Sequence, residues 1–163
     1  MNIKLFEYSI QYAKGALDVW NEIVNDGAAF PQEKPMDLNE SIDFFMSQSK
    51  TVVAVDVDTN SVKGVYILHP NNVGRCGHIS NASYAVSKDA RGLKIGETLV
   101  KDCMNWAKAL GFKILQFNAV VASNTAALNL YKKLGFTQLG EIPFGFRNKN
   151  GDYETIIPHY IVL

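Results

Sequence analysis

The sequence predicts a single α/β domain in which a mixed sheet is flanked by four helices. Short runs rich in β-branched residues, such as "TVVAVDVD" and "SVKGVYILH", have the composition and period of strands. Longer segments such as "ETLVKDCMNWAKAL" place apolar residues at the spacing of amphipathic helices. No internal repeat or linker interrupts the 163 residues, so we assign residues 1–163 to one domain.

The first half of the chain is expected to contain a strand at residues 3–8, two helices and a hairpin. Ser9 is the expected N-cap of the first helix, which ends at the stop signal "NDG", residues 25–27. The loop "AAFPQEKPMD" leads to a second helix at residues 39–49, with Ile42, Phe45 and Met46 facing inward. Two strands follow, and the turn at residues 58–61 joins them.

The second half is expected to alternate strands and helices. A strand at residues 78–86 precedes the segment "ARGLKIG" and its helix. A strand at "KILQFNAVV" and a helix at residues 124–134 come next. Strands near residues 136–142 and 153–162 close the chain. The predicted order is therefore β-α-α-β-β-β-α-β-α-β-β.

Charge and cysteine content argue against several function classes. The 16 Lys and Arg residues balance 16 Asp and Glu residues, so no overall positive field attracts nucleic acid or an anionic membrane. Cys76 and Cys103 show no zinc-like spacing with each other or with a histidine, so we expect two free thiols and no metal. The first residues resemble neither a secretory signal nor a membrane span, and we expect a soluble, cytoplasmic protein.

The entrance to the long helix combines glycines with basic residues. Gly92 and Gly96 flank Lys94, and Arg91 precedes them. A glycine-rich turn at a helix N-terminus offers unpaired N–H groups to an anion, and arginine adds bidentate contacts to phosphate. The segment fits a pyrophosphate cradle, although a capped surface helix with solvated basic residues would explain this stretch alone equally well. It matches neither a P-loop nor a Rossmann turn.

The following helix carries Asn124 and Tyr131, which are two helical turns apart and therefore point to the same side. Asn124 can cap the helix or bind a ligand amide, and Ala127 leaves room between the two side chains. The Tyr131 hydroxyl can donate a hydrogen bond or a proton to a leaving group. A cap and a core tyrosine would explain each residue alone, whereas the cradle nearby favours a ligand site.

The two motifs together resemble the GNAT (Gcn5-related) N-acetyltransferases. The acetyl-CoA signature of this family is Arg or Gln followed by x-x-Gly-x-Gly or Ala, and then an Asn-x-x-Ala-x-x-x-Tyr-x-x-x-Gly-Phe helix. Residues 91–96 read "RGLKIG" and residues 124–136 read "NTAALNLYKKLGF". The resemblance implies a GNAT fold, whose mostly antiparallel sheet splays between strands four and five and holds acetyl-CoA in the gap.

The resemblance also implies roles for individual residues. Backbone groups of residues 84–86 would pair with pantetheine, and N–H groups of residues 92–96 would bind the pyrophosphate. Tyr131 would protonate or hydrogen-bond the departing thiolate after direct attack by a deprotonated amine. The expected coenzyme-binding residues are Tyr84, Ala85, Val86, Arg91, Gly92, Leu93, Lys94, Ile95, Gly96, Asn124 and Tyr131.

The sequence departs from the family pattern in two places. Lys94 stands where the family usually has its middle glycine. We expect an ordinary helical conformation there, because a positive φ would cost lysine about 1 kcal/mol or more. The strand before the cradle also lacks the glutamate that serves many relatives as general base, so either His78 or a chain of water molecules would take this role.

Two asparagines on the strands are candidates for the acceptor site. Asn81 and Asn118 lie inside apolar strands, where an unpaired buried amide costs about 1–3 kcal/mol. They therefore either face the acceptor pocket or pair with backbone where the strands splay. Their positions and the loop "GAAFPQ" are similar to fungal GNAT enzymes that detoxify proline analogues such as azetidine-2-carboxylate. This similarity makes Asn81 and Asn118 catalytic and substrate-binding residues, and it places Phe30 and Pro31 in the pocket lid.

The resemblance implies an N-acetyltransferase that acts from acetyl-CoA on a small amine, such as an amino acid or proline analogue. The alternatives are a protein lysine or N-terminal acetyltransferase and a non-catalytic acyl-CoA-binding regulator. Tyr131 argues against the regulator, and the loop at residues 28–36 favours a closed pocket over a groove for protein. Phe144 and Phe146 either border this pocket or pack within their loop. The terminal "YIVL" contributes either to a homodimer, common in the family, or to the core.

Overall fold

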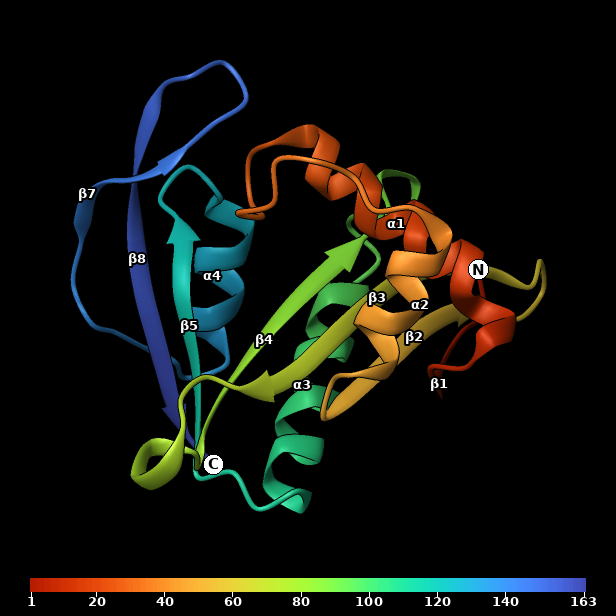
Figure 1. Ribbon diagram of the computed structural model, residues 1–163, viewed down its shortest axis with the longest axis horizontal. Coiled ribbons are helices and arrows are strands. Elements are labelled where there is room, and N and C mark those ends of the chain that lie inside the picture. The colour runs from red at the N-terminus through yellow and green to blue at the C-terminus, as the bar shows by residue number, and fades with distance from the viewer.

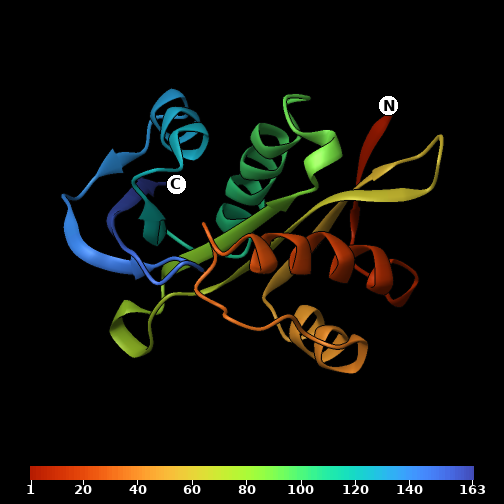
Figure 2. The same ribbon diagram turned by 90° about the horizontal axis from the view of Figure 1, so that it is seen from above.

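Eight strands form one mixed sheet in the computed structural model, which describes residues 1–163. The strand order is β1-β2-β3-β4-β5-β8-β6, and β7 also pairs with β8. Helices α1 and α2 cover one face of the sheet, and α3 and α4 cover the other (Figure 1, Figure 2). The expected α/β class with a mixed sheet and four helices is confirmed.

The bounds of the elements differ from the predicted ones mainly at their ends. The strands are β1 (Ile3–Glu7), β2 (Lys50–Asp56), β3 (Ser61–Pro70), β4 (Ile79–Val86), β5 (Ile114–Val121), β6 (Thr137–Gln138), β7 (Ile142–Arg147) and β8 (Tyr153–Val162). The helices are α1 (Ala13–Asp26), α2 (Leu38–Met46), α3 (Ile95–Ala109) and α4 (Thr125–Lys133). No helix combines the length and the apolar character needed to cross a membrane.

Of the two predicted ends of α1, the C-terminal one is confirmed and the N-terminal one is wrong. Gly27 adopts φ 61° and ψ 31° at the C-cap, the left-handed conformation that the "NDG" signal predicts. The predicted cap at Ser9 is wrong. A short 3₁₀ turn at Ile10–Tyr12 precedes the helix, and the Ser9 side chain makes no capping hydrogen bond.

Helix α2 begins and ends earlier than predicted. The Asp37 carboxylate accepts the Glu40 N–H at 2.9 Å and the Glu40 carboxylate accepts the Asp37 N–H at 2.9 Å, so a capping box starts the helix at Leu38. Phe45 is buried, as expected, but Met46 is 67% exposed at the end of the helix. The inward orientation predicted for Met46 is wrong, because the short helix presents one narrow face to the core.

The sheet splays between β4 and β5, as the resemblance implies. These two strands are parallel, and only Ile79 with Ile114 and Ser80 with Leu115 are paired. By contrast, β4 pairs with β3 continuously from Gly64 with Val86 to Pro70 with Ser80. Beyond Ser80 the two halves of the sheet therefore diverge (Figure 1), and a cavity lies in the cleft beside β4.

Two hydrophobic clusters cover the two faces of the sheet. On the α3–α4 face, Leu99 and Cys103 of α3 pack with Tyr66, Phe117 and other strand residues. On the α1–α2 face, Trp20, Phe30 and Phe45 pack against β2 and β3. Because side chains alternate along a strand, each strand residue can be assigned to one face from its neighbours in these clusters.

The C-terminal strands differ from the prediction. The single strand expected at residues 136–142 is replaced by the two-residue strand β6 and by β7, which begins at Ile142. Phe144 has φ 58° and interrupts the pairing of β7 with β8 between Ile142 and Phe146. Ile161 and Leu163 of the "YIVL" end pack against the core, whereas Val162 is 69% exposed.

Candidate active site

A cavity of about 660 Å³ lies in the cleft, and we call it the cleft cavity. It is bounded by the start of α3, by α4, by β4 and by the end of α1 with the loop after it. Its lining includes most of the predicted coenzyme-binding residues, namely Tyr84, Val86, Arg91, Gly92, Lys94, Ile95, Gly96, Asn124 and Tyr131. Ala85 and Leu93 do not line it, because Ala85 is buried on the α1–α2 face and Leu93 is 51% exposed.

The start of α3 presents a row of free N–H groups to this cavity. No N–H group of residues 92–97 donates a hydrogen bond to a protein acceptor, and the first bond of the helix joins the Thr98 N–H to the Lys94 carbonyl at 3.1 Å. These donors have no intrahelical partner, and the helix dipole adds partial positive charge. The segment therefore has the unpaired N–H groups that an anion site at this position requires.

Lys94 does not have the helical conformation that we expected. It is the N-cap residue of α3, with φ 62° and ψ 13° in the left-handed region, and its side chain caps nothing. The preceding Gly92 also has a positive φ of 78°. The prediction failed because a tight turn must aim successive N–H groups at one point, and this turn requires left-handed residues.

Charged side chains surround the row of N–H groups. Asp26, the last residue of α1, forms ion pairs with Lys88 at 2.5 Å and with Arg91 at 3.4 Å. The hydrogen bond from Lys88 is the main cause that lowers the pKa of Asp26. Sequence reasoning did not find Asp26, because nothing in the chain indicates that the end of α1 reaches the cradle.

Glu97, in the first turn of α3, joins the two helices that border the cleft. Its carboxylate accepts hydrogen bonds from Lys101 at 2.7 Å and from Lys133 of α4 at 2.6 Å. These two lysines lower the pKa of Glu97 to about 2. Glu97 is thus ionised and neutralised by the protein, so it does not repel an anion bound at the helix start.

Tyr131 is held firmly on the other side of the cleft cavity. It is 9% exposed, and its ring lies 4.6 Å from the Phe117 ring, 5.3 Å from the Phe136 ring and 5.6 Å from the His159 ring, measured between centroids. Burial raises the pKa of Tyr131, so its hydroxyl is protonated at neutral pH. Tyr131 is therefore a hydrogen-bond donor facing the cavity.

Asn124 caps α4, as one of its two predicted roles requires. Its side-chain oxygen accepts the Ala127 N–H at 3.2 Å, and the residue also lines the cleft cavity. The cap therefore uses the oxygen, while the side-chain NH₂ group has no protein partner and can donate to a ligand.

Tyr84 contributes a hydroxyl as well as the backbone groups predicted for it. The hydroxyl is buried without a hydrogen-bond partner, and burial raises its pKa well above the ordinary value. The nearby Cys103 thiol is fully buried, and burial raises its pKa to about 12. Cys103 is thus inert, and the exposed Cys76 lies outside the cleft cavity.

The two strand asparagines lie on the α1–α2 face, opposite Tyr131. Their neighbours Ala82, Tyr84 and Phe117 belong to the cluster on the α3–α4 face, so Asn81 and Asn118 point the other way. Asn81 accepts the Ala82 N–H at 2.8 Å, just beyond the last β4 residue that pairs with β5. Asn81 therefore pairs with backbone at the splay, which is one of the two predicted arrangements.

Asn118 pairs with a side chain that sequence reasoning missed. Its amide exchanges two hydrogen bonds with Asn71, at 3.1 Å and 2.7 Å, and its oxygen also accepts from Gln116 at 3.2 Å. Asn71 comes directly after β3, so the reciprocal amide pair joins the two halves of the sheet across the start of the cleft. No motif in the sequence indicates that Asn71 and Asn118 lie together.

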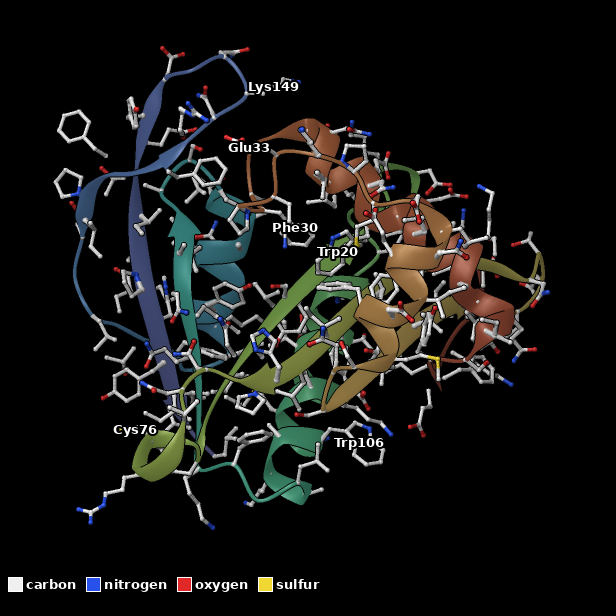
Figure 3. The ribbon with its side chains drawn as sticks, in the orientation of Figure 1. Trp20, Phe30, Glu33, Cys76, Trp106 and Lys149 are labelled. Carbon is white, nitrogen blue, oxygen red and sulfur yellow. The ribbon has the colours of Figure 1, made fainter.

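Phe30 and Pro31 line a second cavity of about 690 Å³ between the α1–α2 loop and the β7–β8 hairpin, which we call the loop–hairpin cavity. The hairpin contributes Gly145 and Phe146, and Glu33 of the loop pairs with Arg147 of β7 across the gap. Figure 3 shows Glu33 on the loop, Lys149 near the tip of the hairpin and Phe30 beside Trp20. Phe144 is 78% exposed and does not border the cavity.

The α1–α2 loop separates the two cavities. Asp26, Ala28 and Ala29 line the cleft cavity. Gly27, Phe30 and Pro31 line the loop–hairpin cavity. His78, the candidate base, is exposed before β4 and lines neither cavity. No cluster of His, Cys, Asp and Glu residues could hold a metal ion.

Comparison with known proteins places this arrangement among acetyltransferases. Residues 17–136 match the model of the Acetyltransferase (GNAT) family. The chain is 32% identical to the N-acetyltransferase aca1 of Schizosaccharomyces pombe over 156 residues, which cover 86% of this chain and 74% of that protein. It is 24% identical to an L-methionine sulfoximine/L-methionine sulfone acetyltransferase of Pseudomonas aeruginosa, over 88% of this chain and 85% of that protein.

A solved structure extends the similarity to the whole fold. A GCN5-related N-acetyltransferase from Kribbella flavida superposes with a TM-score of 0.90 at 30% sequence identity. The superposition covers 99% of this chain and 98% of that one. The similarity therefore extends over nearly the full length of both chains.

Proposed function

The chain belongs to the acetyltransferase (GNAT) family, and from this premise we propose that it transfers acetyl from acetyl-CoA to the amine of a small molecule. The row of free N–H groups at residues 92–97 carries this proposal, because a family acetyltransferase must hold a pyrophosphate and all of these residues except Leu93 line the cleft cavity. Arg91, Lys88 and Lys94 add positive charge around them.

The remaining residues of the cleft cavity fit the rest of the coenzyme. The edge of β4 beyond Ser80 has lost its pairing with β5, so its backbone groups are available to a pantetheine arm. Asn124 donates its side-chain NH₂ group to the same arm. When bound, acetyl-CoA supplies an activated thioester that a neutral amine can attack.

Tyr131 assists the departure of the sulfur. The ring is fixed by aromatic contacts and the hydroxyl keeps its proton, so the residue donates to negative charge that develops on the thiolate. Free phenol and thiol groups have similar pKa values, about 10 and 8.5, but burial makes Tyr131 a weaker acid than free phenol. The hydrogen bond is therefore its main contribution before proton transfer.

We assign the acceptor to the α1–α2 face of the sheet beside the cleft. Asn81 and Asn118 face this side, and Phe30 and Pro31 form part of the wall. The free NH₂ group of Asn81 orients the reacting carbonyl. The relative from Pseudomonas aeruginosa is named for amino-acid acceptors, which supports an amino acid or proline analogue over a protein tail.

The test is release of free thiol from acetyl-CoA with a panel of amino acids, azetidine-2-carboxylate and a basic peptide.

Tyr131→Phe should lower kcat about 10²-fold and leave the dissociation constant for acetyl-CoA nearly unchanged, because only the hydroxyl is removed. Calorimetry measures the affinity. An unchanged kcat would remove Tyr131 from the mechanism, and an absence of coenzyme A binding at millimolar concentration would refute the proposal.

Two further expectations belong to this proposal. A cytoplasmic enzyme would keep Cys76 and Cys103 as free thiols, and both cysteines are free in the structure. A homodimer stays a prediction from the resemblance. Ile161 and Leu163 of the "YIVL" end pack against the core, while Val162 is exposed at the end of β8.

A further inference from the structure

A polar patch on the α1–α2 face lies where the cleft opens, and we call it the amide patch. Its members are His69, Asn71, Asn81, Gln116 and Asn118. His69 lies directly opposite Asn81 in the β3–β4 register, so the two side chains share a face at close range. Asn71, two residues beyond His69, joins the patch to Asn118 and Gln116 of β5.

The amide patch and Tyr131 lie at the same level on opposite faces of the sheet. The Tyr131 ring packs on Phe117 at 4.6 Å between centroids, and Asn118 is the next residue of β5. At this level β4 and β5 are no longer paired. The proposed function places the thioester between these two strands, so an acceptor on the amide patch would approach it from the side opposite Tyr131.

His69 is the one titratable member of the patch, and a hydrogen bond sets its tautomer. Its Nδ1 lies 2.9 Å from the Pro70 carbonyl oxygen. A carbonyl oxygen can only accept, so Nδ1 carries the proton of the neutral ring and Nε2 carries the lone pair. Nε2 hydrogen-bonds to no protein group, and the side chain is half-buried. The ring is thus arranged to accept a proton at Nε2.

We propose that His69 is the general base that removes a proton from the acceptor ammonium group. This inference rests on the proposed function. The alternatives from the sequence are His78 and a chain of water molecules. His69 and His78 both lie outside the two cavities, but His69 is opposite Asn81 in the β3–β4 register, whereas His78 is exposed before β4. The pairing of His69 with Asn81 across β3 and β4 is invisible in the sequence, where the two residues are separated by the loop at residues 71–78.

The proton balance of the reaction is complete with these groups. The acceptor enters as an ammonium ion, and His69 Nε2 takes one proton and passes it to water. The neutral amine then forms the C–N bond while the C–S bond breaks. The second proton on nitrogen passes to water as the amide forms. One proton is delivered to the sulfur by way of Tyr131, which is reprotonated from solvent, so one proton is released overall.

The experiment compares two acceptors in thiol-release assays at neutral pH. One is the amino acid with the highest kcat/KM in the panel, which is largely protonated. The other is hydroxylamine, which is largely unprotonated and needs no base before attack. His69→Ala should lower kcat/KM about 10²-fold for the amino acid and leave the value for hydroxylamine near that of the wild type. Added imidazole should restore part of the lost rate with the amino acid.

Three controls keep the outcome interpretable. His78→Ala, the matched change of an exposed histidine outside the site, should retain wild-type activity with both acceptors. His69→Gln keeps a polar side chain of similar size and should show the same acceptor-dependent loss. It replaces His69→Ala in the comparison if circular dichroism shows that His69→Ala is poorly folded. Coenzyme A affinity should be unchanged in both His69 variants.

Several results would overturn the inference. An equal loss with both acceptors would give His69 a structural role, and no loss with either would leave water as the base. Both results would leave the proposed acetyl transfer standing. A wild-type protein that releases no thiol with any amine would refute the proposed function itself.

Discussion

At the scale of single residues, the active site depends on side chains and backbone groups that the fold keeps free of protein partners. The N–H groups of residues 92–97 have no acceptor, and the Tyr131 hydroxyl is held protonated by burial. Nε2 of His69 has no donor. A polar group that is fully buried without a hydrogen-bond partner lowers the stability of the protein. These groups can instead hydrogen-bond to a ligand or to solvent.

The left-handed conformation of Lys94 lowers the stability of the protein, and this cost can be measured without any ligand. Its φ of 62° is accessible to glycine at little cost, whereas a residue with a Cβ atom loses roughly 1–2 kcal/mol there. Lys94→Gly should therefore raise the free energy of unfolding by about 1 kcal/mol in urea denaturation. Lys94→Ala, which removes the charge but keeps the Cβ atom, is the control and should not stabilise. Equal effects of the two substitutions would show that the turn is not strained.

At the scale of elements, the end of α1 touches the cradle at the start of α3. Asp26 pairs with Lys88 and Arg91, which are two of the cations that we assign to the pyrophosphate. The carboxylate therefore competes with the coenzyme for the same partners. This contact couples the α1–α2 loop to coenzyme binding.

Asp26→Asn should strengthen coenzyme A binding by up to about 5-fold, because a partly exposed ion pair of at most ~1 kcal/mol no longer has to be broken. Calorimetric titration measures the change. Asp18→Asn, which removes a carboxylate of α1 that pairs with Lys14 outside the cleft cavity, is the matched control and should leave the affinity unchanged. Weaker binding by the Asp26 variant would mean that this carboxylate supports the cradle.

The elements also explain which parts of the site the sequence could predict. The cradle and the Asn124–Tyr131 pair are local motifs, with each partner set by helical spacing or by consecutive residues. Asp26, Asn71 and His69 are missing from that prediction because they reach the site through contacts between distant segments. The conformation of Lys94 was predicted wrongly, since a side-chain pattern does not report the φ that a turn requires. The start of α2 was predicted too late, although the capping box that begins it is formed by residues only three apart, Asp37 and Glu40.

At the scale of the whole molecule, the sheet consists of two halves joined at the start of the cleft. The β4–β5 pairing ends at Ser80 and Leu115, and the Asn71–Asn118 amide pair lies near this junction. One face of each half is covered by its own helix, α3 or α4, and the Glu97–Lys133 ion pair bridges them. A ligand that fills the cleft would therefore bind both halves together.

Coenzyme A should accordingly stabilise the fold. At 100 times its dissociation constant, a ligand that binds only the native state adds about 2.7 kcal/mol, which corresponds to a rise in Tm of roughly 5–10 °C for a chain of this size. Scanning calorimetry measures the shift. Pantetheine at the same concentration lacks the pyrophosphate and should give a much smaller shift, and equal shifts would show that the α3 cradle contributes nothing to binding.

The α1–α2 loop has a final consequence for how this enzyme can diversify. Asp26, Ala28 and Ala29 face one chamber, and Gly27, Phe30 and Pro31 face the other. If the acceptor and the coenzyme bind on the two sides as proposed, a mutation of Phe30 that changes the acceptor would also shift the adjacent backbone that lines the coenzyme side. Variants selected for new acceptors should thus carry additional, compensating substitutions in the α1–α2 loop. Substitution of its small residues Gly27, Ala28 and Ala29 should be poorly tolerated.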